Sequence, residues 1–187
     1  MTVKRLKVLL WLAVLLNQNG FTQERVWERP PRVFWINFGG GVARSAEFFG
    51  VGGYLGASFD SRVGLISLRT STAVKLTIRP TGGFFDLPVT EITDLGVLYG
   101  LCERSTTTIV SGSAGIAIVW TKKESTTDEL GTATIGIPFE AESVAIPLPV
   151  LGIGLKAYGN INAKNPFVGI LVCFYFSKFR ELQNPAN

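Results

Sequence analysis

The chain contains no histidine among its 187 residues. Acid–base catalysis near neutral pH usually recruits histidine, because its side chain changes charge between about pH 5 and pH 8. An enzyme built on this chain would have to use carboxylates or lysine instead, so the composition favours a non-enzymatic protein. The sequence also lacks an apolar run of the roughly 20 residues that a membrane-spanning helix needs.

Cysteine is scarce as well, with only Cys102 and Cys173. An exported chain enters an oxidising compartment, where a disulfide is permitted. The two residues fall on the fourth and eighth of the strands predicted below, which are not neighbours in an up-and-down barrel. The sequence therefore leaves two interpretations: a disulfide across the interior of the barrel, or two separate buried thiols. Two cysteines without further soft ligands do not predict a metal site, and we expect no cofactor.

The N-terminus has the pattern of a removable export signal. Three basic residues within the first seven precede an apolar stretch over residues 8–16, and small residues follow at Gly20 and Thr22. This order of basic, apolar and small residues is typical of a secretory signal peptide. We predict a signal peptide over residues 1–22 and a charged periplasmic lead-in over residues 23–32.

Much of the positive charge lies in that segment. The whole chain has 18 lysines and arginines against 14 acidic residues, a formal charge of +4. The predicted signal peptide holds three of the basic residues and none of the acidic ones, which leaves 15 against 14, a charge of +1, for the rest. A charge this small provides no basic surface for nucleic acid, so we predict no nucleic-acid partner.

Eight segments of the remaining chain alternate apolar residues with small or polar ones. In residues 151–160, leucine, isoleucine and alanine alternate with glycine, lysine, tyrosine and asparagine. A period of two puts every second side chain on the same face of a strand, and an apolar outside over a polar interior is typical of a transmembrane β-barrel. We predict an all-β, eight-stranded antiparallel up-and-down barrel over residues 33–179 and a C-terminal tail over residues 180–187. The predicted strands cover residues 33–43, 49–59, 63–74, 94–103, 108–120, 131–145, 151–160 and 167–177.

The lengths of the connections give an independent indication. If the N-terminus is periplasmic, the near-side turns are short and cover residues 60–62, 104–107 and 146–149. The far-side connections are longer and more polar, at residues 43–48, 75–93, 121–130 and 160–166. Outer-membrane barrels show this asymmetry between short periplasmic turns and longer outer loops. We therefore predict a location in the outer membrane, with the periplasm as the alternative.

The alternation is least regular in the third predicted strand, over residues 63–74. It falters near Ser67. A β-bulge or a partly exposed strand end would produce such an interruption. We expect one of these two irregularities at this point of the sheet.

The inward positions of this register carry polar side chains into the interior of the barrel, its lumen. They are Asn37, Tyr54, Ser58, Asp94, Ser111, Ser113, Glu140, Lys156, Tyr158 and Asn160. Glu140 and Lys156 straddle a hairpin centred on Leu148, which predicts that they lie opposite each other. Such a pair could lock the register of the sheet, or it could contact a proton or a ligand. The structural interpretation is favoured, because side chains nearly fill the lumen of an eight-stranded barrel.

A resemblance to a known class of proteins rests on four stretches of the chain, residues 21–23, 93–100, 134–140 and 152–162. They resemble small eight-stranded outer-membrane barrels and, more narrowly, exported barrel-like proteins of Bacteroidetes-type bacteria. The last strand resembles the aromatic-rich closing strand that the barrel-assembly machinery reads, although the chain continues past Phe176 and Phe179. The resemblance implies insertion by that machinery and supplies no catalytic residue.

Together these patterns predict a non-enzymatic barrel in outer-membrane lipid, monomeric because a closed sheet has no free edge. Its role stays open among three possibilities: structural support, contact through the far-side loops, and passage of small apolar molecules. The first alternative is a soluble periplasmic barrel that binds a lipid inside, with Leu151, Ile153 and Leu155 lining its core. The second is a membrane enzyme that uses Glu140, Lys156 or a lumen serine.

Overall fold

The structure, a computed structural model, describes residues 32–61, 63–75, 90–105, 107–123 and 132–179. The predicted signal peptide, nearly all of the lead-in, the C-terminal tail and parts of two far-side connections lie outside the described residues. Within the described ranges, no helix is long and apolar enough to cross a bilayer.

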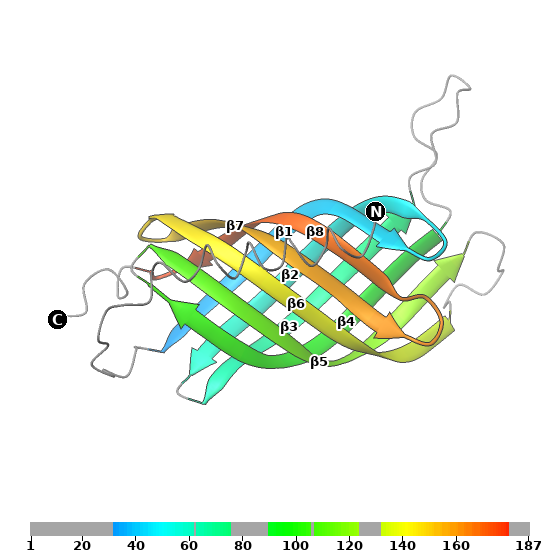
Figure 1. The fold of residues 1–187 in the computed structure, drawn as a ribbon, viewed down its shortest axis with the longest axis horizontal. Helices are drawn as coiled ribbons and strands as arrows, with labels where there is room; N and C mark the ends of the chain where they lie inside the picture. Colours follow the sequence, from blue (N-terminus) through cyan, green and yellow to red (C-terminus); the bar gives the residue numbers. More distant parts are fainter. Residues whose placement is uncertain (1–31, 62, 76–89, 106, 124–131, 180–187) are drawn as a thin grey trace, which may run out of the picture. The chain divides into compact units, whose positions relative to one another are not determined.

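Eight antiparallel strands form a closed barrel in which each strand pairs with its neighbours in the chain and β1 pairs with β8 (Figure 1). The predicted fold class is confirmed. The strands are β1 (Val33–Ser45), β2 (Phe49–Ser61), β3 (Gly64–Lys75), β4 (Thr90–Arg104), β5 (Thr108–Lys123), β6 (Thr132–Leu148), β7 (Leu151–Asn162) and β8 (Phe167–Ser177). We call the end at which β1 begins the near end and the opposite one the far end.

Side chains alternate strictly between the two faces of the sheet. On β1, Phe34 and Phe38 are 53% and 48% exposed on the outside, whereas Trp35 and Asn37 between them are fully buried in the lumen. An apolar outer surface of this extent requires lipid, and a closed barrel satisfies its backbone hydrogen bonds within that lipid. The soluble alternative is wrong, because it needed Ile153 and Leu155 in the interior and both lie exposed on the outside.

The hairpin between β6 and β7 differs from the prediction. β6 continues to Leu148, through most of the predicted turn, and the chain turns at Pro149 and Val150. The pairing shifts between Ala145 and Leu148. Pro147 lies in this interval and has no N–H to donate to the ladder, which confines proline to bulges and strand edges.

Of the two irregularities expected near Ser67, the β-bulge is wrong, because β3 pairs without a break with both β2 and β4. The alternation of apolar and polar residues falters for another reason. Leu65 and Ile66 are successive apolar residues that point to opposite faces, Leu65 into the lumen and Ile66 outward. Ser67 also faces inward, and its hydroxyl lies 2.9 Å from the hydroxyl of Ser58 on β2.

We expect Ser67→Ala to lower the free energy of unfolding by about 1 kcal/mol, because it leaves the buried Ser58 hydroxyl without this partner. Urea-induced unfolding in detergent micelles measures the change. In a double-mutant cycle, adding Ser58→Ala should cost less than it does alone. Strictly additive effects would contradict the hydrogen bond.

Large apolar side chains are buried in the lumen toward the near end. Trp35 at the start of β1 and Tyr175 at the end of β8 belong to one buried cluster with Leu65. Phe179, two residues beyond β8, is fully buried in the same cluster. Polar groups lie at the same end, since the carboxylate of Asp60 is 2.7 Å from Arg104.

Candidate functional site

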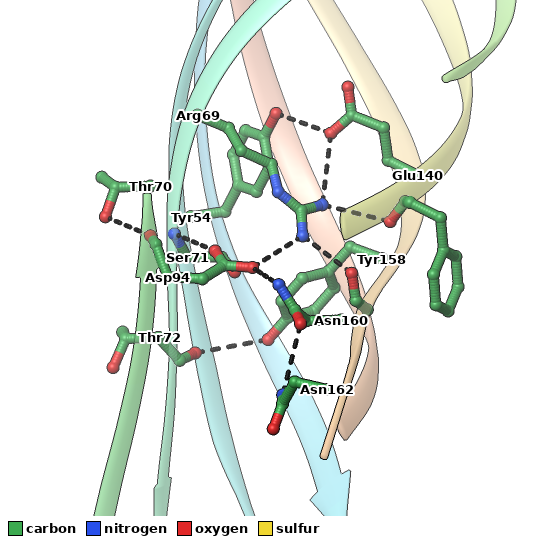
Figure 2. A network of polar contacts seen from close by, with 12 residues as sticks. Tyr54, Arg69, Thr70, Ser71, Thr72, Asp94, Glu140, Tyr158, Asn160 and Asn162 are labelled. Atoms are coloured by element: carbon green, nitrogen blue, oxygen red, sulfur yellow. Dashed lines mark hydrogen bonds and ion pairs between the residues drawn. The ribbon is translucent and has the colours of Figure 1, made fainter. Parts of the chain in front are cut away.

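Arg69 on β3 is the centre of a buried polar network in the lumen (Figure 2). Its Nη2 lies 2.9 Å from Oδ2 of Asp94, and its Nη1 lies 3.6 Å from Oε2 of Glu140. The same guanidinium donates to the carbonyl oxygens of Phe139 and Gly159, at 3.1 and 2.8 Å. Arg69 thus links β3 to β4, β6 and β7 across the interior of the barrel.

Asp94 on β4 is the acidic partner with the most donors. Its Oδ1 accepts the hydroxyl of Ser71 at 2.6 Å and the backbone N–H of Ser71 at 3.2 Å. Its Oδ2 accepts Arg69 and the side-chain amide of Asn160, both at 2.9 Å. Both oxygens of this fully buried carboxylate are therefore hydrogen-bonded, which offsets the cost of its burial.

Lys156 on β7 is the second buried cation. Its Nζ lies 2.9 Å from Oε2 of Glu142 and 3.4 Å from Oε2 of Glu140. It also lies 3.8 Å from the centre of the Tyr54 ring, within the range of a cation–π interaction. One ammonium group therefore bridges two carboxylates of β6.

The predicted register of this pair is off by two residues. The structure brings Glu140 and Lys156 together, but the residue directly opposite Lys156 is Glu142, and Tyr158 lies opposite Glu140. The difference follows from the hairpin, which turns one residue later than the predicted centre at Leu148.

Hydroxyl groups complete the surroundings of the two glutamates. The donors are Tyr54 at 2.9 Å and Ser113 at 3.0 Å for Glu140, and Ser111 at 2.8 Å and Tyr175 at 2.9 Å for Glu142. The glutamates, like Asp94, are thus paired with a cation and hydrogen-bonded by neutral donors. This combination is what keeps charged groups stable inside a protein.

All ten polar residues that the sequence predicts in the lumen are buried there. Most join the network, and the Tyr158 hydroxyl also donates to the carbonyl of Thr72 at 3.3 Å. Ser58 instead pairs with Ser67 toward the near end. The amide of Asn37 makes no side-chain hydrogen bond within the described part of the chain.

Sequence reasoning missed Arg69, Glu142 and Tyr175. The signal for Arg69 was present, because a period of two from Ser67 places it on the inward face together with Ser71. Glu142 follows Glu140 by two residues and Tyr175 follows Cys173 by two, so the same period assigns both to the lumen.

The disulfide considered from the sequence is not formed, since Cys102 and Cys173 are both free. Cys102 on β4 lies opposite Ser111 of β5, whereas Cys173 on β8 lies opposite Gly39 of β1 and Gly154 of β7. The two strands are not neighbours in the barrel wall.

We expect a reducing agent to leave the free energy of unfolding within about 0.5 kcal/mol of its value without reductant. Loss of a structural disulfide would instead cost about 2–5 kcal/mol. Unfolding curves recorded with and without dithiothreitol distinguish the two cases. A destabilisation of the larger size would contradict the free thiols.

The charged groups of the lumen form one buried set of ion pairs and hydrogen bonds. Two cations, Arg69 and Lys156, are shared among three carboxylates, and none of these five residues is more than 5% exposed. Within the described residues, no group of acidic, histidine or cysteine side chains could hold a metal ion. The carboxylates are paired with these cations and hydrogen-bonded by hydroxyl and amide groups of the same lumen. The guanidinium of Arg69 also donates to two backbone carbonyls, although its Nε has no hydrogen-bond partner among the described residues.

The sequence matches no family model and none of the curated proteins. Solved structures do match. Neisserial surface protein A superimposes with a TM-score of 0.56 at 9% identity, covering 78% of this chain and 96% of that one. The attachment invasion locus protein Ail of Yersinia pestis gives 0.51 at 11% identity, covering 78% and 97%. The chain has the fold of a bacterial outer-membrane β-barrel.

A second structure of Ail, in complex with the heparin analogue sucrose octasulfate, matches this barrel with a TM-score of 0.50 at 12% identity, covering 78% of this chain and 97% of that one. Identities this low establish the fold of the barrel and leave its role to other arguments. The structural neighbours are bacterial outer-membrane barrels, as expected from the alternation and the connection lengths.

Proposed function

We propose that this outer-membrane β-barrel is a non-enzymatic protein whose interior is structural and whose far-side connections make its contacts. One observation carries the proposal: Arg69, Asp94 and Lys156 are fully buried in the middle of the lumen. Groups that line an open channel or a substrate site are exposed to solvent. Arg69 pairs with Asp94, and Lys156 pairs with Glu140 and Glu142, so charged groups from four strands contact one another instead.

The filled lumen argues against passage of small apolar molecules through it. Such a molecule would have to separate Arg69 from Asp94 and Lys156 from Glu142, which are 2.9 Å apart in each pair. It would also have to pass the buried side chain of Trp35 at the near end. Separating buried ion pairs costs several kcal/mol, and an apolar solute offers no replacement hydrogen bond.

The same packing argues against the membrane enzyme. Ser111 and Ser113 both donate to glutamates, and both glutamates are engaged with Lys156. A nucleophile needs an activating base and an accessible position beside it for the reacting atom. The hydroxyls here are buried and bound to carboxylates that are themselves paired.

The far rim provides the exposed polar groups that a surface contact requires. Arg44, Lys122 and Lys164 are exposed at the ends of β1 and β5 and in the β7–β8 connection. A protein of this fold, Ail, has been crystallised with a heparin analogue, so sucrose octasulfate is a rational first probe for an anionic partner. We also propose that the barrel is monomeric, that the barrel-assembly machinery inserts it, and that it is related to the exported barrel-like proteins of Bacteroidetes-type bacteria that its sequence resembles.

The experiment tests orientation and closure together, in a background in which Cys102 and Cys173 are replaced by serine. A membrane-impermeant maleimide applied to intact cells should label Ala163→Cys in the β7–β8 connection. It should spare the matched control Ser105→Cys in the β4–β5 turn at the opposite end. Purified barrel in vesicles should leave entrapped small solutes in place. Labelling confined to residue 105, or solute leakage through the folded barrel, would contradict the proposal.

A further inference from the structure

The lumen network continues to the far end and reaches the β7–β8 connection. Asn160 donates from Nδ2 to Asp94, and its Oδ1 accepts Nδ2 of Asn162 at 3.2 Å. Figure 2 shows Arg69, Asp94, Asn160 and Asn162 following one another along this line. The last member, Asn162, is also the last residue of β7.

Asn162 builds the turn that follows it. Its Oδ1 accepts the backbone N–H groups of Lys164 and Asn165, at 3.1 and 2.7 Å. Its Nδ2 also donates to the carbonyl of Asn165 at 3.0 Å. The side chain of Asn165 is buried and donates to the hydroxyl of Thr121 on β5 at 3.1 Å. One asparagine therefore connects the shape of the turn to the interior of the barrel.

The neighbouring strand leaves room for this connection. Gly136 on β6 lies opposite Asn162. A Cβ atom at position 136 would collide with the side-chain amide of Asn160. Glycine at this position thus allows Asn160 to lie between Asp94 and Asn162.

We propose that the lumen network positions the β7–β8 connection, so that this connection is a preformed part of the far surface. Asp94 holds Asn160, Asn160 holds Asn162, and Asn162 fixes the backbone that carries the exposed Lys164. A partner that meets the far surface, as the proposed function requires, then meets this turn in a single conformation. The positioning itself does not depend on that function.

The test is the rate of amide hydrogen exchange at Lys164 and Asn165, measured by NMR on the whole barrel in micelles. Asn160→Ala should accelerate exchange about fivefold, the effect expected when a hydrogen bond of ordinary net strength no longer supports the turn. Asn162→Ala, which removes the acceptor itself, serves as the reference for a turn without support. Ser58→Ala removes a lumen hydroxyl of the near half and should leave both exchange rates unchanged.

Gly136→Ala is a second variant that alters no polar group of the network. It should accelerate exchange at the same two amides, because the added methyl group displaces the Asn160 amide. Heat-modifiability on a detergent gel and dispersed NMR spectra verify that each variant is folded. The contradicting result is that the two amides exchange at the parent rate in Asn160→Ala and Gly136→Ala but faster in Asn162→Ala. The turn would then keep its conformation without the lumen network, and the inference would be wrong. That result would leave the proposed function intact, since cysteine labelling tests it separately.

Discussion

Replacing Arg69 with methionine is expected to lower the free energy of unfolding by about 3–5 kcal/mol. Methionine approximates the length of the side chain, so the main loss is the charge that lies between Asp94 and Glu140. Both carboxylates would stay buried with one cation fewer, and a buried charge without compensation is among the costliest defects in a protein. Reversible unfolding by guanidinium in lipid vesicles, followed by tryptophan fluorescence, measures the change.

Two further variants show that the effect arises from charge. Asp94→Asn added to Arg69→Met should recover part of the lost stability, because it removes one of the unpaired charges. Leu68→Met, on the lipid-facing side of the same strand, should stay within about 0.5 kcal/mol of the parent chain. An Arg69→Met barrel as stable as the parent would show that the guanidinium contributes nothing to the fold.

Lys156→Met should destabilise the barrel by a similar amount, about 3–5 kcal/mol. The lysine is the cation nearest to both Glu140 and Glu142, and it lies over the ring of Tyr54. Its loss leaves two carboxylates on the same face of β6, two residues apart and within the buried interior. The same unfolding experiment in vesicles provides the measurement.

The rescue of this variant distinguishes pairing from simple packing. Glu142→Gln should destabilise the parent chain but partly restore Lys156→Met, since the glutamine carries no charge that needs a partner. Glu140→Gln serves as a comparison, because Glu140 also contacts Arg69. If Lys156→Met and Glu140→Gln each leave the stability unchanged, the interpretation of the lumen as a structural ion network is wrong.

The sequence predicted the strands and the inward side chains well because both depend on a local rule. Successive residues of a strand point to opposite faces, so the side-chain pattern around Asn37, Tyr54 or Lys156 suffices to place each of them in the lumen. The connection lengths predict the orientation in the same local way, and that orientation stays a prediction.

The network itself could not be predicted, because it depends on contacts that no local pattern contains. Arg69 reaches carbonyl groups of residues 139 and 159, and these neighbours are brought near β3 only by closure of the barrel. The pairing of Glu142 with Lys156 depends on a register shift beside Pro147, where the strand continues through most of the predicted turn. Leu65, an apolar residue in the lumen, also interrupted the alternation that would have identified Arg69.

The most direct test of the account is heat-modifiability of the protein recovered from an outer-membrane fraction. Boiled and unboiled samples are compared on a detergent gel, because a closed membrane barrel resists the detergent until it is heated. We predict that the protein is found in this fraction and that boiling shifts its mobility. A protein that is soluble in the periplasmic extract and shows no shift would contradict the membrane barrel.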